Sequence, residues 1–355
     1  MDTLLSPCRR RLLGAFGGLG TLALAGCGER RLSPQAAAAP LQFSGETMGT
    51  AYVVKLAGAA LPAARLEALA ADVQAALDGV NRGMSLYRPE SELMRLNRHP
   101  QGRPLPLSKD LYEVLAAGQQ VAELSQGAFD VSVAPLVNAW GFGPQKRREV
   151  PATGELQAGR AAVDYRGLRL DAQHRTATKA HDGLQADLGG IAKGYGVDLA
   201  ARAIEALGVE DYMIEVGGEV RTRGRNAQGQ PWRIGIEEPD AVPRRARRVV
   251  PLAGRAMATS GDYRIYFEQA GRRYSHEIDP RTAAPIAHGL ASVTVVADDC
   301  MRADALATAL IVLGPQAGWA LAQRQGLAAY FIVRDSGGRL HDRATEEFDA
   351  VAAAA

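Results

Sequence analysis

Cysteine is scarce in this chain, and so is an excess of charge of one sign. Three cysteines among 355 residues are too few to hold the fold, so its core must do so. The 41 lysines and arginines are interleaved with 39 aspartates and glutamates and leave a net charge of +2, so no nucleic-acid partner is expected. The one basic cluster, 244–248, is interpreted as a solvated loop. The composition, 47% hydrophobic, predicts a globular protein with one large domain or two lobes.

The N-terminus has the pattern of a bacterial export signal. Arg9, Arg10 and Arg11 precede an apolar run at 12–25, which is too short for a transmembrane helix. The run closes on Leu-Ala-Gly-Cys, which resembles the lipobox of bacterial lipoproteins, where the cysteine is lipidated and becomes residue one. The alternative is an ordinary signal peptide with a chance cysteine.

We therefore expect a lipoprotein signal peptide at 1–27 that ends at a lipidated Cys27, a flexible tether at 28–40 and a globular domain at 41–350. Processing there removes Cys8 and leaves Cys300 as the free thiol, so no internal disulfide is expected.

Helix and strand patterns mix irregularly along the domain. Apolar residues recur at helical spacing over 66–80, and Ser91 and Ser108 stand where helix N-caps are expected. A further helix is expected to end at Gly208, and the alanine-rich end, 350–355, to be frayed. Because strands and separate helices do not follow strict βαβ alternation, the sequence predicts the α+β class. The remaining expected elements are strands at 48–56, 212–216, 232–238, 249–254, 263–268, 292–297 and 328–333, a hairpin within 165–180, and helices at 301–313 and 318–325.

The segment DLGGIAKGYGVD, 187–198, places four glycines and a lysine at a helix entrance. Glycines have no side chains, so the backbone N–H groups can approach a ligand. The helix N-terminus carries a partial positive charge and Lys193 adds a full positive charge, so the segment suits a phosphate. A tight turn and close helix packing explain the same glycines without a ligand. The spacing fits neither a P-loop nor a dinucleotide fingerprint, which excludes both.

Asp304 and Thr308 in the segment MRADALATAL are four residues apart and share one face of a helix. A carboxylate and a hydroxyl form a half-site of hard oxygens that suits Mg²⁺. The alternative is a helix start, with Asp304 in its first turn and Thr308 bonded back to a carbonyl.

His276 follows a predicted hairpin and could act as a general base, since its ordinary pKa lies near neutral pH. The commoner fate of such a histidine is a place on the surface or in the core. Phe129, Trp140 and Phe142 are likewise typical of a core rather than of a ring-stacking site.

Eight segments together resemble the ApbE family, the FAD:protein FMN transferases, and they occur in the family's order over nearly all of the mature chain. They are ETMGTAY, SLYRPESELMRLN, GAFDVSVAPLVNAWGFG, DLGGIAKGYGVD, IEVGGEVRTRG, ATSGDYR, YSHEIDPRT and VTVVADDCMRADALATAL. The resemblance implies a two-lobed α+β fold that binds FAD and Mg²⁺ in the cleft between its lobes. It also implies that FAD is cleaved at its pyrophosphate, that AMP leaves, and that FMN becomes a phosphoester on a threonine of a target protein.

The resemblance also assigns residues. It implies that His276 assists the transfer, with His276 or a nearby carboxylate taking the proton, and that Asp304 is catalytic as well as metal-binding. Ala284 departs from the glycine of many relatives, which concerns only a turn. The implied FAD contacts are Met48, Tyr87, Ala128, Phe129, Asp130, Asp187, Lys193 and, through its backbone, Ile278; the implied metal positions are Gly190 and Ala307 by carbonyl and Asp304 and Thr308 by side chain.

Two other functions stay open at this point. One is a Mg²⁺-dependent FAD pyrophosphatase that gives FMN and AMP, although the family pattern at Tyr87 favours transfer. The other is a non-catalytic periplasmic lipoprotein that binds flavin. The resemblance further implies a lipid-anchored periplasmic protein at the inner membrane, whose acceptor is an exported protein such as a subunit of a redox complex.

Overall fold

A computed structural model describes residues 40–144 and 146–354. The expected signal peptide, Cys27 and nearly all of the expected tether lie outside the described residues. Within them, Cys300 is a free, buried cysteine, as expected.

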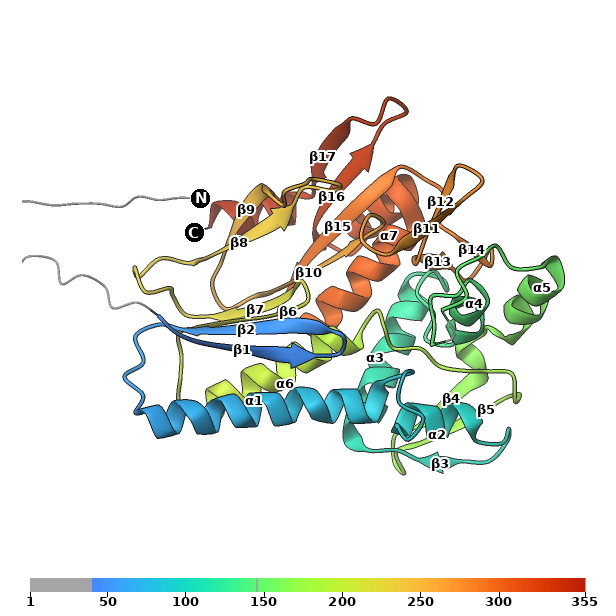
Figure 1. Ribbon diagram of the computed structural model, residues 1–355, viewed down its shortest axis with the longest axis horizontal. Helices are drawn as coiled ribbons and strands as arrows, with labels where there is room; N and C mark the ends of the chain where they lie inside the picture. The colour runs from blue at the N-terminus through green and yellow to red at the C-terminus, as the bar shows by residue number, and fades with distance from the viewer. Residues whose placement is uncertain (1–39, 145, 355) are drawn as a thin grey trace, which may run out of the picture. The chain divides into compact units, whose positions relative to one another are not determined.

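The main element is an eight-stranded sheet in which every neighbouring pair is antiparallel (Figure 1). Together with the helices described below, it confirms the expected α+β class. In spatial order the strands are β1 (Leu41–Thr47), β2 (Thr50–Leu56), β6 (Tyr212–Val216), β7 (Glu219–Arg223), β10 (Ala256–Gly261), β15 (Leu290–Ala297), β16 (Ala328–Arg334) and β17 (Leu340–Ala344).

Three helices pack against one face of this sheet. They are α1 (Ala63–Met84), α6 (Ala192–Ala206) and α7 (Cys300–Arg324), and α6 contacts both of the others. Helix α7 is long and apolar enough to cross a membrane. It packs on β10 and β15, however, and 61% of its most apolar 18-residue stretch is buried inside the protein. Two helices were expected in this stretch, and α7 does kink at Gly314, where φ is 83° ahead of Pro315.

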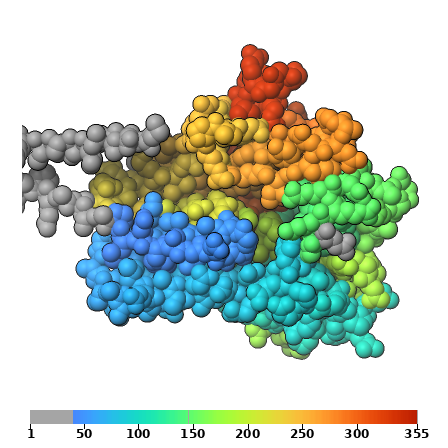
Figure 2. Space-filling model, viewed as in Figure 1, coloured from blue at the N-terminus to red at the C-terminus, as the bar shows by residue number. Residues whose placement is uncertain are grey.

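The opposite face of the sheet is covered by a ribbon and a terminal helix. Strands β8 (Trp232–Glu237) and β9 (Ala246–Leu252) pair with each other, and α8 (Glu346–Ala353) packs on β9 and β16. Phe348 of α8 is fully buried and its ring stacks on Tyr330. On the face shown in Figure 2, the chain around the β16–β17 turn projects from the surface (red).

Residues 85–190, which we call the inserted lobe, join α1 to the glycine turn before α6. Ser91 and Ser108 cap α2 (Glu92–Arg98) and α3 (Lys109–Leu124) by accepting the N–H groups of Met94 and Leu111, as predicted. The inserted lobe shares one continuous core with α7, β15 and β16. Its other elements are β3 (Leu105–Pro106), α4 (Ala134–Ala139), α5 (Thr153–Ala162), a 3₁₀ turn (Tyr165–Gly167), and the predicted hairpin β4 (Leu168–Asp171) and β5 (Thr176–Lys179).

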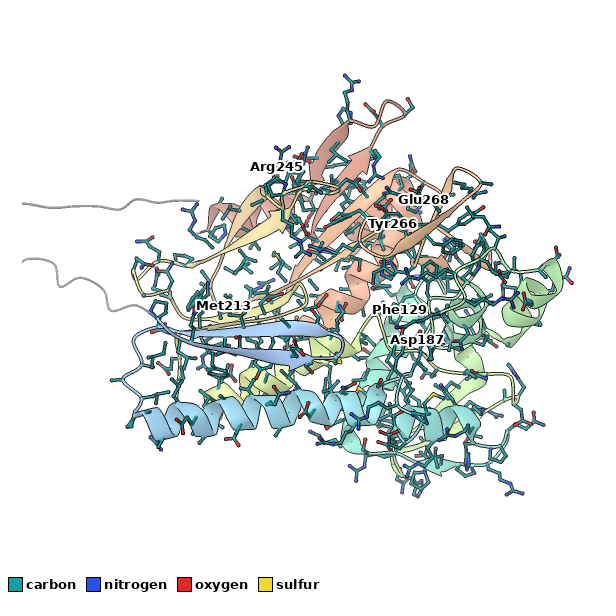
Figure 3. All side chains as sticks on the ribbon, viewed as in Figure 1. Phe129, Asp187, Met213, Arg245, Tyr266 and Glu268 are labelled. Atoms are coloured by element: carbon teal, nitrogen blue, oxygen red, sulfur yellow. The ribbon has the colours of Figure 1, made fainter. Side chains whose placement is uncertain are left out.

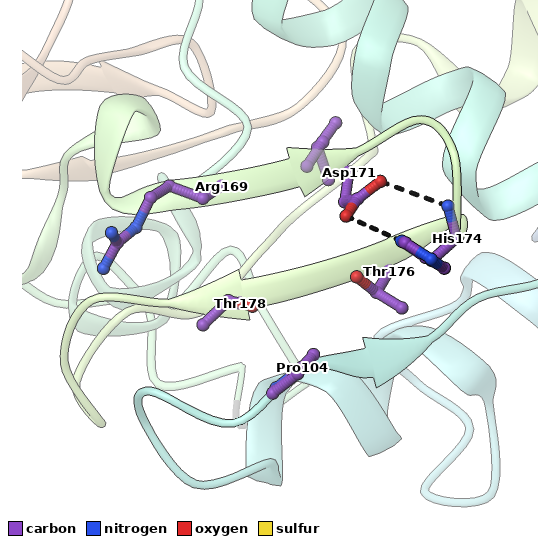
Figure 4. Close-up of a pocket in the computed structure, with 7 residues that line it drawn as sticks. Pro104, Arg169, Asp171, His174, Thr176 and Thr178 are labelled. Atoms are coloured by element: carbon purple, nitrogen blue, oxygen red, sulfur yellow. Dashed lines mark hydrogen bonds and ion pairs between the residues drawn. The ribbon is translucent and has the colours of Figure 1, made fainter.

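A hollow of about 300 Å³ lies beside the β4–β5 hairpin (Figure 4). Asp171 closes the turn of this hairpin by accepting hydrogen bonds from the backbone of Gln173 and His174 and from the His174 ring. None of the predicted site residues lines the hollow, so its contacts support the hairpin rather than the expected flavin site.

Three sequence expectations were wrong in detail. The strand expected at 48–56 begins at Thr50, because Met48 takes a left-handed φ of 46° in a turn that joins it to the unpredicted β1. The end expected to be frayed belongs to α8 as far as Ala353, because buried Phe348 anchors that helix. The basic cluster 244–248 is a loop only at Arg244 and Arg245, because the rest of it belongs to β9, and all four of its arginines pair with carboxylates.

Helices α6 and α7 cross closely because Gly194 has no side chain. A Cβ added there would lie 2.3 Å from the carbonyl oxygen of Cys300. Asp198, one turn further along α6, accepts the N–H groups of Cys300 and Met301 at the start of α7.

We expect Gly194→Ala to lower the free energy of unfolding by about 3 kcal/mol, because a methyl group there must push apart two backbone segments. Chemical unfolding of the globular domain, without the signal peptide and the expected tether, measures this loss. Gly83→Ala is the matched control, since a Cβ at Gly83 in α1 meets nothing within 4 Å. Equal stability of the two variants would contradict the packing described here.

Candidate functional site

The crossing of α6 and α7 brings the predicted phosphate and metal residues together. The Lys193 Nζ atom lies 3.9 Å from Asp304 Oδ1, and the Gly194 N–H donates a 3.0 Å hydrogen bond to Asp304 Oδ2. A third side chain joins them from β7, where Glu219 Oε1 lies 2.6 Å from the same Nζ atom. One ammonium group therefore stands between two buried carboxylates.

Burial controls the charges of this cluster. It raises the pKa of Asp304, and it raises the pKa of Glu219 to about 7, while the charge of Lys193 opposes both shifts. Burial alone would lower the pKa of Lys193, but the charges of Asp304 and Glu219 outweigh it and raise that pKa. Lys193 therefore keeps its proton, and a further positive charge here would favour the ionised form of both carboxyl groups.

The predicted metal positions lie beside this cluster. Asp304 and Thr308 follow each other on one face of α7, and the Thr308 Oγ1 atom is 3.2 Å from Ser260 Oγ of β10. A Cβ added to Gly190 would lie only 2.9 Å from Thr308 Oγ1, so the glycine turn closes over the same face. Ala307 is fully buried within α7, where its carbonyl accepts the helical hydrogen bond and keeps one lone pair.

These oxygens fit a magnesium ion better than a transition metal. Among residues 40–144 and 146–354, no group of three His, Cys, Asp or Glu side chains is arranged to hold a metal. Mg²⁺ needs few protein ligands and takes oxygen donors, which a carboxylate, a hydroxyl and backbone carbonyls supply. The buried Glu219 Oε2 atom, to which no described residue donates a hydrogen bond, adds to the uncompensated negative charge. Binding of the ion stays a prediction.

Two of the predicted flavin segments run side by side. The N–H of Asp187 donates a 2.8 Å hydrogen bond to the carbonyl of Val131, and Figure 3 shows Phe129 and Asp187 close together. Phe129 and Ala128 are buried, and the Phe129 ring would lie 3.3 Å from a Cβ added to Gly190. The interpretation of Phe129 as a core residue is therefore confirmed, although it packs directly on the glycine turn.

The carboxyl groups of Asp130 and Asp187 have local partners. Asp130 accepts hydrogen bonds from the backbone and hydroxyl of Ser132 and from the backbone of Tyr165, and burial raises its pKa. Asp187 accepts the N–H of Gly189 at 2.8 Å, and burial raises its pKa as well. Asp130 thus shapes the backbone of its own segment, while Asp187 orders the start of the glycine turn.

Tyr87 follows the C-terminal end of α1, and Met48 lies in the β1–β2 turn near the same end of that helix. The Tyr87 side chain is largely exposed, and its hydroxyl donates a 3.1 Å hydrogen bond to the carbonyl of Phe142. Its partial burial and the charge of Asp187 raise its pKa. The Met48 side chain contacts α6, where its Cε atom would lie 3.0 Å from a Cβ at Gly196. Tyr87 therefore lies at the start of the inserted lobe, and Met48 lies beside the first turns of α6.

His276 lies at the bend between β12 (Arg272–Ser275) and β13 (Ile278–Asp279). Its backbone N–H donates to the carbonyl of Ile265, and its Nδ1 atom lies 3.1 Å from the same oxygen. Burial lowers the pKa of His276 to about 4, and the charge of Lys193 acts in the same direction. The imidazole is therefore neutral near pH 7, which a general base requires.

An aromatic cluster supports this bend. Trp140 stacks on Tyr274, Tyr274 on Phe267 of β11 (Tyr266–Gln269), and Phe142 meets both Phe267 and the His276 ring. Trp140 is buried, as the core interpretation predicted. Figure 3 places Tyr266 and Glu268 on this hairpin, away from Phe129 and Asp187.

Ile278 is buried in the same cluster, and its strand pairs with β14 (Ala284–Pro285). The turn between these strands has its left-handed residue at Ala283, with φ of 58°, rather than at Ala284, which takes a place in β14. Ala284, which replaces the glycine of many relatives, therefore lies in a strand and not in the turn.

Sequence reasoning missed Glu219 and Glu277. Glu219 follows the Gly-Gly turn of IEVGGEV and is 2% exposed, and Glu277 follows His276 directly and is 8% exposed. The adjacent glycines and histidine were the only available signals, because nothing local in the sequence shows that a glutamate will be buried.

Comparisons with known proteins agree with this geometry. A family model described as the ApbE family matches residues 48–331. A protein of Haemophilus influenzae named FAD:protein FMN transferase is 44% identical over 303 residues, which are 84% of this chain and 88% of that protein. One of the same name from Vibrio cholerae is 42% identical over 318 residues, 89% of this chain and 92% of that protein. The crystal structure of the Pseudomonas stutzeri flavinyl transferase ApbE, apo form, is similar with a TM-score of 0.80 and 43% identity, and covers 89% of this chain and 98% of that chain. The present chain therefore belongs to the ApbE family.

Proposed function

We propose that this protein transfers the FMN moiety of FAD to a threonine hydroxyl of a target protein, releases AMP, and needs Mg²⁺ to do so. Its relatives at 42–44% identity carry the name FAD:protein FMN transferase, which supports a transferase acting on FAD and a protein acceptor. The observation that carries the proposal is the convergence of Lys193 and Asp304, 3.9 Å apart, at a glycine turn.

The residues of the α6 entrance would hold the diphosphate of FAD. The Lys193 ammonium group supplies a full positive charge, and the N-terminus of α6 adds its partial charge. Glu219 holds Lys193 at 2.6 Å, so the ammonium group is fixed before a ligand arrives. Preorganised charge of this kind stabilises the negative charge that builds up when a phosphoryl group is transferred.

Asp304 and Thr308, with carbonyls of Gly190 and Ala307, would hold Mg²⁺. A bound magnesium ion supplies charge neutralisation at the diphosphate. When both carboxyl groups are ionised, Asp304 and Glu219 against one ammonium group leave a net negative charge that this ion would compensate.

His276 would accept the proton of the acceptor hydroxyl. The threonine oxygen attacks the phosphorus on the FMN side, the bond from that phosphorus to the bridging oxygen breaks, and AMP leaves with the oxygen and its negative charge. The hydroxyl proton moves to the Nε2 atom of His276, because its Nδ1 atom faces the carbonyl of Ile265. The chain thus supplies positioning, electrostatic stabilisation and a base.

The place of action is part of this proposal. Leu-Ala-Gly-Cys at 24–27 supports lipidation at Cys27 and a periplasmic protein anchored to the inner membrane, with an exported acceptor. The chain that follows Cys27 would act as a tether up to the first strand at Leu41.

We expect Asp304→Asn to lower flavin transfer at limiting Mg²⁺ by about 100-fold, because it removes the carboxylate that stands beside Thr308. Asparagine keeps an oxygen for the Gly194 N–H, so the fold should persist. Incubation with FAD, Mg²⁺ and an acceptor domain, followed by a denaturing gel, measures covalent labelling by flavin fluorescence. Glu268→Gln, at an exposed site on β11, is the control. Full labelling by the Asp304 variant would reject the metal assignment, and AMP release without an acceptor would favour hydrolysis.

We expect Lys193→Ala to weaken FAD binding by roughly 10- to 100-fold, as loss of a charge-assisted hydrogen bond of about 1.5–3 kcal/mol implies. Fluorescence titration with FAD measures the affinity. Lys109→Ala, which removes an exposed lysine from α3, is the matched control and should bind FAD normally. Equal affinity of the two variants would reject the phosphate role of Lys193.

A further inference from the structure

Glu277 is a buried carboxyl group beside the proposed base. It follows His276 at the bend between β12 and β13, is 8% exposed, and its Oε1 atom lies 3.7 Å from His276 Nε2. No described residue donates a hydrogen bond to this carboxyl group or forms an ion pair with it other than His276. A buried carboxyl group without a cationic partner is costly, so its place at this ring is not explained by stability.

The ring of His276 is oriented so that Nε2 faces Glu277. The Ile265 carbonyl can only accept a hydrogen bond, so the Nδ1 atom 3.1 Å away carries the hydrogen of the neutral ring. The Nε2 atom then has a free lone pair, and this atom is the one near Glu277. A lone pair and an ionised carboxylate repel each other, which makes a proton between them favourable.

The surrounding charges set where that proton lies. Burial raises the pKa of Glu277 to about 8, against the positive charge of Lys193 and with the help of the negative charges of Asp304 and Asp262. Burial also lowers the pKa of His276 to about 4. Near pH 7 the pair therefore holds one proton, on the Glu277 carboxyl group, and it loses that proton as the pH rises through the pKa of Glu277.

We propose that Glu277 is a positioning residue for His276, whose carboxylate orients the imidazole ring and balances the positive charge that Nε2 gains from the acceptor hydroxyl. This inference rests on the proposed function. When the acceptor O–H bond breaks, an Nε2–H bond forms and the imidazolium ion pairs with the Glu277 carboxylate. The proton later leaves to water and restores the pair. A protonated Glu277 cannot balance the imidazolium charge, so transfer should accelerate as the pH rises.

The first test is the pH profile of transfer in Glu277→Gln and Glu277→Asp. Glutamine imitates the protonated carboxyl group, so its rate should stay flat between pH 6 and about 9 and fall about tenfold below the wild-type plateau. Aspartate should restore part of the rise with pH. Glu268→Gln, an exposed change on the preceding β11–β12 hairpin, should keep the wild-type profile. A wild-type profile in Glu277→Gln would overturn the inference.

A second measurement does not depend on turnover. The chain has six histidines, so the ring ¹⁵N signal of His276 can be assigned by its loss in His276→Gln. In wild-type protein without FAD or metal, the chemical shift of Nε2 should change as the pH is raised through about 8, the pKa of Glu277. In Glu277→Gln, the same shift should stay constant over this pH range. No difference between the two proteins would overturn the pairing, even if wild-type protein labels an acceptor. The expected coupling without any labelling by wild-type protein would instead contradict the proposed function and the catalytic part of this inference.

Discussion

The close crossing of α6 and α7 is the constraint on which the candidate site depends. Each helix places a carboxylate at the start of the other: Asp198 of α6 accepts the N–H groups of Cys300 and Met301, and Asp304 of α7 accepts that of Gly194. Both contacts set a negative charge against the positive end of a helix. The crossing is close because glycine stands at position 194, and it fixes Asp304 beside Lys193. The residues that fasten the two helices are thus the same ones that assemble the charges of the site.

In this arrangement, two buried carboxylates share one lysine as their cationic partner. Such a cluster is a poor way to stabilise a fold, since desolvation of three charged groups costs more than a single ammonium group returns. It is a suitable place for a divalent cation and a diphosphate. The cation supplies positive charge for the carboxylates, and the diphosphate supplies negative charge for the ammonium group. The pair of His276 and Glu277, which also feels the charge of Lys193, follows the same logic, because a neutral base needs a partner once it becomes positively charged.

Local signals in the sequence predicted the elements that local physics controls. Ser91 and Ser108 do cap helices, Gly208 takes the left-handed φ of 74° that ends α6, and Asp304 and Thr308 share a face of α7. Strands β1 and β7 were missed although they form local hairpins with β2 and β6, and β10 was missed because it pairs with segments far away in the chain, β7 and β15. Glu219 and Glu277 were missed for the same reason, since their burial and raised pKa values arise from packing against distant elements. The resemblance to a family supplied the reaction, which no spacing in the sequence could have specified.

The most direct test of the central claim is the coupling between FAD and Mg²⁺ in calorimetric titrations of the wild-type soluble domain. If Lys193 and Asp304 hold one diphosphate and one ion at the same place, each ligand must tighten the binding of the other by the same factor. We predict that FAD binds at least about tenfold more tightly with saturating Mg²⁺ than with a chelator, a coupling of about 1.4 kcal/mol. Equal FAD affinity in the two conditions would contradict the account.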